Sequence, residues 1–165
     1  MDNKDIHIGI LGAGKIGTAI YNLLVASGFD YNITVADKNV QRDIFVRPIE
    51  LHSDYTKECP NLDIFVKDKT LIINALPYQL NPIVYKYCVE HNVPYFDLSE
   101  DEFLDEWIEK KEYISPTRTG IPFTMPHCGL APGLSTVIAN DLVKDFYAVH
   151  NLKIRVGALS QHSSN

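Results

Sequence analysis

The sequence has 165 residues, enough for one domain with a sizeable core, or for one domain and the opening of a second. It is 45% hydrophobic and 22% charged, and no stretch approaches the roughly 18 apolar residues of a membrane span. A net charge of -6 with scattered basic residues argues against a nucleic-acid binder, because phosphate neutralisation requires clustered Lys and Arg. We expect a globular protein that binds neither nucleic acid nor membrane.

The N-terminus and the cysteines indicate a reducing, cytoplasmic setting. The segment MDNKDIHIGILGAG runs directly into a strand pattern and lacks the basic region, apolar core and cleavage site of a secretion signal. Cys59, Cys88 and Cys128 are widely spaced and odd in number, which fits neither a disulfide framework nor a paired-cysteine metal site. We expect reduced thiols and no metal.

The beginning of the chain predicts a strand, a helix and a second strand. Residues 6–11 form an apolar run, and apolar residues then recur at helical spacing over 15–27 until Gly28 supplies a helix stop. The β-branched segment 33–36 closes on Asp37. This is a βαβ unit of the length that a parallel crossover requires.

The same alternation continues along the chain as far as residue 125. Apolar runs predict further strands over 49–52, 70–75, 94–98 and 121–125. Helical spacing predicts helices over 39–45, 62–67, 81–91 and 99–111, the last with Ser99 at its N-terminus. Alternation of this kind predicts an α/β fold whose open, doubly wound parallel sheet is covered by helices on both faces.

The strongest local motif is Gly12-Ala13-Gly14-Lys15-Ile16-Gly17, a GxGxxG that leaves the first strand and opens the first helix. Gly12 allows the tight turn, Gly14 the close approach of a pyrophosphate, and Gly17 the packing of helix on strand. This context predicts a Rossmann dinucleotide-binding domain, in which we assign Gly12, Gly14, Lys15, Ile16 and Gly17 to cofactor binding.

The acidic partner of this motif is expected about 20 positions further on, at the end of the second strand, where it binds the adenine-ribose hydroxyls. Asp37 lies at that position. A carboxylate repels a 2′-phosphate, so we predict NAD as the cofactor, while the nearby Lys38 and Arg42 leave NADP possible.

Two further segments lie where open α/β sheets place their ligands. Ala75, Leu76 and Pro77 lie at the C-terminal end of the strand 70–75 and are assigned to the nicotinamide side of the cleft. Tyr78 after them is either a site residue or a loop residue. The roles of Asp97 and Asp101 are left open in the same way, because Asp101 suits a helix N-terminus as well as a site.

The third segment, residues 126–133, is a loop rich in Gly and Pro between a strand and a helix over 134–146. Such a loop is stiff, which suits a site more than a linker. His127 and Cys128 suggest a nucleophile or a metal site, but adjacent side chains rarely point into one site and no third ligand has zinc spacing.

Together, the segments GAGKIG, NALPYQLNP, YFDLSED, CGLAPG and IRVGAL resemble the saccharopine dehydrogenase family, which includes lysine 6-dehydrogenase and carboxynorspermidine dehydrogenase. The resemblance implies hydride transfer between a nicotinamide and the carbon of a C–N bond in an amino-acid-like substrate. It also implies that Tyr78, Asp97 and Cys128 lie near the nicotinamide, as positioning groups before acid–base catalysts. The alternative is a dinucleotide-binding module that senses or assembles without chemistry.

Family members continue well beyond the segment IRVGAL, so the resemblance implies two parts in this chain. Residues 1–129 would form the NAD(P)-binding Rossmann domain, and residues 130–165 the start of an incomplete α+β substrate or dimerisation domain. Its predicted helix over 134–146 and strand over 152–156 would then expose apolar faces, which predicts a homo-oligomer.

Overall fold

Six parallel strands form one sheet in the order β3-β2-β1-β4-β5-β6. The computed structural model describes residues 6–39, 46–110, 122–155 and 157. The strands are β1 (His7–Leu11), β2 (Asn32–Asp37), β3 (Val46–Pro48), β4 (Leu71–Asn74), β5 (Tyr95–Asp97) and β6 (Thr124–Met125). This order is that of the Rossmann fold, which confirms the predicted class.

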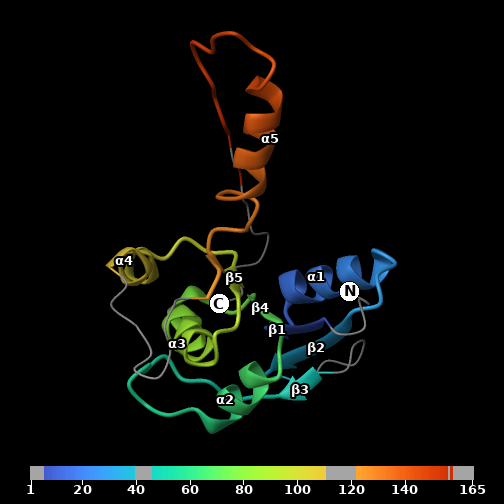
Figure 1. Ribbon diagram of the computed structural model, residues 1–165, viewed down its shortest axis with the longest axis vertical. Coiled ribbons are helices and arrows are strands. Elements are labelled where there is room, and N and C mark those ends of the chain that lie inside the picture. Colours follow the sequence, from blue (N-terminus) through green and yellow to red (C-terminus); the bar gives the residue numbers. More distant parts are fainter. Residues whose placement is uncertain (1–5, 40–45, 111–121, 156, 158–165) are drawn as a thin grey trace.

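Helices lie on both sides of the sheet (Figure 1). They are α1 (Lys15–Ala26), α2 (Pro60–Lys67), α3 (Asn81–His91), α4 (Glu102–Lys110) and α5 (Leu134–Val143), with a short 3-10 helix η2 (Tyr78–Leu80). Helix α1 covers one face, α2 and α3 cover the other, and α5 projects away from the sheet. None of the helices in the described part of the chain is long and apolar enough to cross a membrane.

The larger core lies on the face covered by α2 and α3. Helix α3 is apolar on almost all sides and is buried over most of its length, between the sheet and α2. The face covered by α1 has a smaller core around Ile8, Ile10 and Val35. Cys59 and Cys88 are buried in the larger core.

Most predicted elements are present, with ends displaced by a few residues, but the strand predicted over 49–52 is wrong. The chain pairs with β2 three residues earlier, at Val46–Pro48. Ile49 and Leu51 lie in an irregular loop and still pack against the core. Their burial explains why this segment has the apolar pattern of a strand without being one. The helix predicted over 39–45 falls largely on residues 40–45, outside the described residues.

Two predictions near the C-terminal half also need correction. Residues 152–155 form no strand, because no described segment pairs with them, and a strand is stabilised only by such pairing. Helix α4 is capped by Asp101 and not by Ser99: Asp101 Oδ1 accepts hydrogen bonds from the amides of Phe103 and Leu104.

Candidate functional site

The loops after β1 and β4 meet at the carboxyl edge of the sheet, where the strand order reverses. The amide of Ala75 donates to the Leu11 carbonyl oxygen at 2.7 Å, and the amide of Gly12 donates to the Ala36 carbonyl oxygen at 2.8 Å. These bonds hold the glycine loop between β2 and β4. Open α/β sheets bind their ligands in the crevice at this reversal.

The three glycines of the loop have different physical requirements. Gly12 has φ +99°, and a Cβ on it would lie 2.7 Å from the Ala75 carbonyl oxygen. A Cβ on Gly17 would run into the carbonyl oxygen of Gly12. A Cβ on Gly14, in contrast, would meet nothing within 4 Å. The fold therefore requires Gly12 and Gly17, while Gly14 leaves open space above the loop.

This open space lies at the N-terminus of α1. Gly14 is the N-cap residue, and since glycine has no side chain, it cannot satisfy the first amides of the helix. Lys15 and Ile16 follow in the first turn with exposed side chains. Free amides and the positive end of the helix dipole form an anion site suited to a pyrophosphate.

Asp37 ends β2 directly beside the glycine loop. Its Oδ2 accepts a hydrogen bond from the Ala13 amide at 2.7 Å, and its Oδ1 accepts one from the Asn39 amide at 2.9 Å. A carboxylate offers about four acceptor positions, so these two bonds leave positions for ribose hydroxyls. They also fix the negative charge in place.

A pocket of about 230 Å³ opens beside Asp37. Asp37, Lys38 and Asn39 line one part of it, and its apolar walls are Ile49, Leu51, Leu76, Pro77 and Leu80. An apolar pocket with a carboxylate at its edge suits an adenosine group. The pocket places Leu76 and Pro77 beside Asp37, whereas the sequence analysis assigned them, with Ala75, to the nicotinamide side of the cleft.

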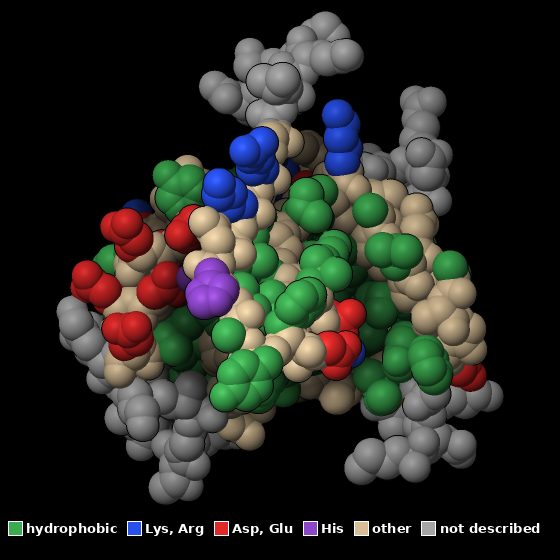
Figure 2. Space-filling view, turned by 90° about the horizontal axis from the view of Figure 1, so that it is seen from above, with side chains coloured by type: hydrophobic (Ala, Val, Ile, Leu, Met, Phe, Trp, Pro, Cys, Tyr) green, Lys and Arg blue, Asp and Glu red, His purple; other side chains and the backbone are tan. Residues whose placement is uncertain are grey.

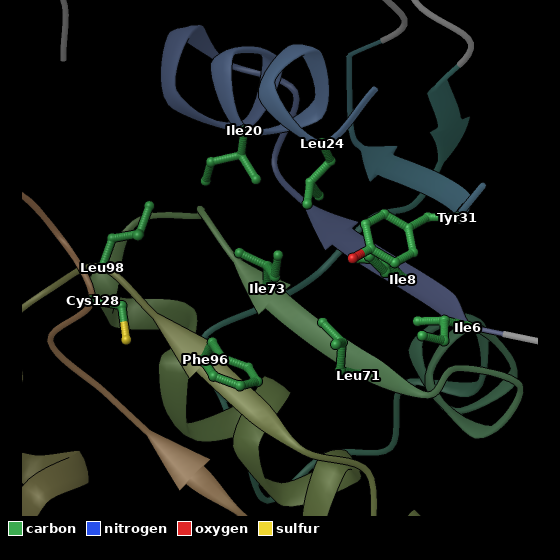
Figure 3. Close-up of a pocket in the computed structure, with 10 residues that line it drawn as sticks. All are labelled: Ile6, Ile8, Ile20, Leu24, Tyr31, Leu71, Ile73, Phe96, Leu98 and Cys128. Atoms are coloured by element: carbon green, nitrogen blue, oxygen red, sulfur yellow. The ribbon is translucent and has the colours of Figure 1, made fainter. Parts of the chain in front are cut away.

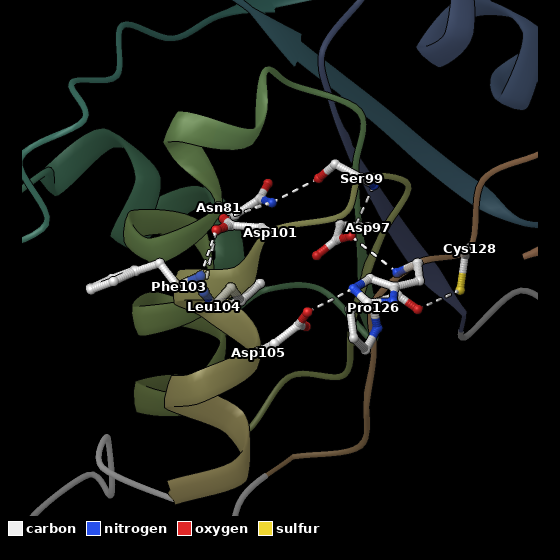
Figure 4. Close-up of polar contacts among 10 residues, drawn as sticks. Asn81, Asp97, Ser99, Asp101, Phe103, Leu104, Asp105, Pro126 and Cys128 are labelled. Carbon is white, nitrogen blue, oxygen red and sulfur yellow. Dashed lines mark hydrogen bonds and ion pairs between the residues drawn. The ribbon is translucent and has the colours of Figure 1, made fainter. Parts of the chain in front are cut away.

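Asp97 ends β5 further along the same edge and belongs to a cluster of polar groups (Figure 4). Its side chain is buried, and Oδ1 accepts hydrogen bonds from the amides of Ser99 at 3.2 Å and His127 at 3.3 Å. Its main-chain oxygen accepts from the Cys128 amide at 2.7 Å. The structure thus brings Asp97 and Cys128 together.

Burial raises the pKa of Asp97, although the Tyr95 hydroxyl and the amides of His127 and Ser99 act in the opposite direction. Burial and the nearby Asp97 also raise the pKa of the Cys128 thiol, whose Sγ lies 3.2 Å from the Met125 carbonyl oxygen. Cys128 is therefore a neutral thiol at pH 7 and is poorly suited to be a nucleophile.

Tyr78 and His127 do not converge on this pair. Tyr78 is 54% exposed on η2, and none of its contacts with described residues joins it to Asp97 or Cys128. His127 turns its ring towards α4, where Nε2 lies 3.1 Å from Asp105 Oδ2. In the part of the chain that the structure describes, no three His, Cys, Asp or Glu residues are grouped as metal ligands.

Sequence reasoning missed the amide network that supports Asp97. Asn74 Nδ2 donates to Asn81 Oδ1 at 2.9 Å and to the Tyr95 hydroxyl at 3.2 Å. Asn81 Nδ2 donates to Ser99 Oγ at 2.8 Å, and both asparagines are buried. The available signal was an asparagine inside each of two buried elements, because a buried amide requires partners.

We expect Asp97→Asn to stabilise the protein at pH 7. A raised folded pKa means that wild-type stability falls as pH rises from the unfolded pKa, about 3.9, through the folded value. The amide removes this penalty and keeps an oxygen for Ser99 and His127. Urea unfolding should show a gain at pH 7 that shrinks towards pH 4. An equal gain in stability at pH 7 and pH 4, or the same gain in the exposed control Asp141→Asn, would contradict this prediction.

A family model for the saccharopine dehydrogenase NADP-binding domain matches residues 8–117, which cover β1 to α4. The chain belongs to this family. The match confirms the family that the sequence motifs indicated, and with the crevice described above it makes residues 8–117 a nicotinamide-dinucleotide-binding domain. No curated protein matches the chain in sequence.

Solved structures share the fold at low identity. Apo saccharopine dehydrogenase (L-Glu forming) from Saccharomyces cerevisiae matches with TM-score 0.64 and 20% identity, over 85% of this chain and 31% of that one. The Rex-family repressor RSP matches with TM-score 0.53 and 15% identity, over 86% and 61%. The structure of RSP in complex with β-NADH matches with TM-score 0.52 and 15% identity, over 87% of this chain and 63% of that one. This chain therefore spans less than two thirds of each of these proteins.

Proposed function

We propose that this chain binds NAD(H) in the crevice at the carboxyl edge of the sheet and serves hydride transfer at a C–N bond of an amino-acid-like substrate. The observation that carries the proposal is the open space above Gly14, which lies over uncapped helix amides. The packing of the fold does not require a glycine at this position, because a Cβ there would meet nothing within 4 Å.

The residues of the crevice fit the parts of a dinucleotide in order along the sheet edge. Gly14, Lys15 and Ile16 would hold the pyrophosphate at the N-terminus of α1. Asp37 and the pocket beside it would hold the adenosine end. Leu76 and Pro77 line this pocket and would contact the adenosine half, whereas Ala75, which follows Asn74 opposite Asp97, would lie towards the nicotinamide half.

Asp37 favours NADH over NADPH. Its two hydrogen bonds to main-chain amides prevent the carboxylate from turning away when a 2′-phosphate approaches. Lys38 lines the same pocket and supplies one compensating positive charge. A fixed carboxylate close to the ribose outweighs a flexible exposed lysine, because the repulsion acts at shorter range and with less screening.

The bound dinucleotide supplies the hydride, so the protein has only to position the reactants and manage protons. Asp97, whose pKa is raised by burial, would exchange a proton with the reacting nitrogen. Cys128, as a neutral thiol, would donate or accept a weak hydrogen bond beside it. Tyr78, exposed on η2 and apart from Asp97 and Cys128, would act only as a positioning group at the open side of the crevice.

The first experiment is calorimetric titration of the chain with NADH and, separately, with NADPH. We expect micromolar binding with a preference of about tenfold or more for NADH, on the scale of one charge repulsion. Failure to bind either dinucleotide would overturn the proposal. Equal binding of both would overturn the role of Asp37 alone.

The second experiment separates an enzyme from a binding module. NADH oxidation is followed by absorbance with a panel of amino acids, each paired with an aldehyde or a 2-oxo acid. Oxidation that depends on both partners supports chemistry at a C–N bond. Tight binding of NADH without oxidation across the panel would favour the non-catalytic module instead.

A further inference from the structure

The loop after β6 holds Asp97 with two successive main-chain amides. The amide of His127 donates to Asp97 Oδ1 at 3.3 Å, and the amide of Cys128 donates to the Asp97 main-chain oxygen at 2.7 Å. Successive amides of an extended chain point in opposite directions, but a left-handed turn directs them to the same side, as in the nests that bind anions. Both bonds to Asp97 therefore depend on the backbone conformation of His127.

His127 has the required left-handed conformation, at φ +62°, although it is not a glycine. This region strains the backbone of a residue with a Cβ, and histidine tolerates it better than most residues do. The same loop uses a glycine where a side chain cannot fit, because a Cβ on Gly129 would lie 2.5 Å from the Leu98 carbonyl oxygen. The histidine at position 127 is best explained by a contact of its ring that offsets the strain.

The ring of His127 makes such a contact with α4. Asp105 of this helix faces the loop (Figure 4), and its Oδ2 lies 3.1 Å from His127 Nε2. Among the described residues, Nε2 has no aligned hydrogen-bond partner, so the contact is an ion pair that acts through charge. Acidic side chains gather over α4, which lies on the left in Figures 1 and 2. The ring therefore faces a negatively charged helix.

Helix α4 is a firm support for the loop. Leu104, the neighbour of Asp105, is fully buried in the larger core, and Trp107 packs against the same core. The N-terminus of the helix is capped by Asp101. Because α4 is anchored in this way, an ion pair with Asp105 restricts the loop that carries His127.

Cys128, the next residue, turns to another part of the molecule. Its side chain lines an apolar groove on the sheet face that carries α1, beside Phe96 and Leu98 (Figure 3). Among the described residues, His127 is not part of this lining. Its ring therefore holds the loop without occupying the space that faces the Cys128 thiol.

We propose that His127 is a positioning residue for the reaction at Asp97: its ion pair with Asp105 holds the loop in the turn that aims two amides at Asp97. The inference rests on the proposed function, since it gives His127 a role at the group that would exchange a proton with the substrate. The ring itself touches no reactant and acts through the loop.

This role has an electrostatic consequence for Asp97. Burial raises the pKa of Asp97, and the Tyr95 hydroxyl, the His127 amide, the Ser99 amide and the charge of His127 act against burial. The neighbouring Cys128 thiol has its own pKa raised by burial and by Asp97. Release of the loop from α4 weakens the two contributions of His127, so the pKa of Asp97 rises further.

NMR of the free chain tests the proposal without any dinucleotide, so its outcome does not depend on whether the chain binds NADH. His127→Asn keeps a residue that tolerates a left-handed φ, but its side chain is shorter than the ring and uncharged. Asp105→Asn removes the charge of the other partner. In both variants we expect a higher pKa of the Asp97 carboxyl and hydrogen exchange at the Cys128 amide that is faster by about tenfold or more.

The direction of the pKa change separates positioning from a direct effect of charge. Loss of the Asp105 charge would by itself lower the pKa of Asp97, because like charges repel. A fall in the pKa of Asp97 in Asp105→Asn would therefore overturn the proposal. A rise without faster exchange at Cys128 would also overturn it, since His127 would then act by charge alone.

Two controls protect the test against a general loss of stability. Glu109→Gln makes the same change of charge at an exposed position of α4 and should cause neither a rise in the pKa of Asp97 nor faster exchange. The Ala75 amide, which donates to Leu11 at 2.7 Å, should exchange as in wild type in every variant. Equal effects in Glu109→Gln, equal acceleration at Ala75, or no effect in either test variant would overturn the role of His127.

Discussion

Gly14→Val should abolish dinucleotide binding, by about 100-fold or more, and leave the fold intact. A Cβ at this position meets nothing within 4 Å, so the side chain enters only the space that a pyrophosphate would occupy. The backbone, at φ -68° and ψ -171°, is open to any residue. Poor capping by Val costs the helix about 1 kcal/mol at most, which urea unfolding would measure beside calorimetric titration with NADH.

Two companion variants separate binding from stability. Gly14→Ser adds a Cβ with a hydroxyl that can cap α1, so stability should hold or rise while NADH binding falls. Gly17→Ala should behave in the opposite way and lose stability, because its Cβ would strike the Gly12 carbonyl oxygen. If Gly14→Val bound NADH as tightly as wild type, the pyrophosphate would not lie over this loop.

The order of strands and helices was predictable because local signals and tertiary structure agree over most of the chain. The apolar run before Gly12 and the β-branched run before Asp37 become β1 and β2, which pair directly. The local signals and the tertiary structure disagree where a strand depends on the strand it pairs with. Residues 49–52 carry a strand pattern, but the register with β2 ends at Pro48.

The candidate site could be predicted where a residue's position follows from a local pattern, and less so where it depends on contacts across the fold. Gly14 and Asp37 follow from a motif and its spacing. Asp97 and Cys128 followed from the family resemblance, and the structure brings them together. Asn81 reaches Ser99 across 18 positions, and His127 reaches Asp105 across the loop, so no local pattern reveals either contact.

Asp37→Ala should weaken NADH binding by about 1 to 3 kcal/mol, the scale of losing charged hydrogen bonds. The carboxylate has two tasks, because it also accepts the Ala13 amide and so supports the glycine loop. The alanine variant removes both, and its loss of affinity would therefore extend to NADPH. Titration with each dinucleotide measures both losses.

Asp37→Asn distinguishes charge from support. The amide oxygen can still accept the Ala13 N–H, so the loop keeps its position, but the negative charge that repels a 2′-phosphate is gone. We expect the preference for NADH to narrow by about tenfold or more, mainly because NADPH binds better. If Asp37→Ala lowers the affinity for both dinucleotides equally and Asp37→Asn changes neither, Asp37 acts only as a support of the loop. If neither changes NADH binding, the ribose lies elsewhere in the crevice.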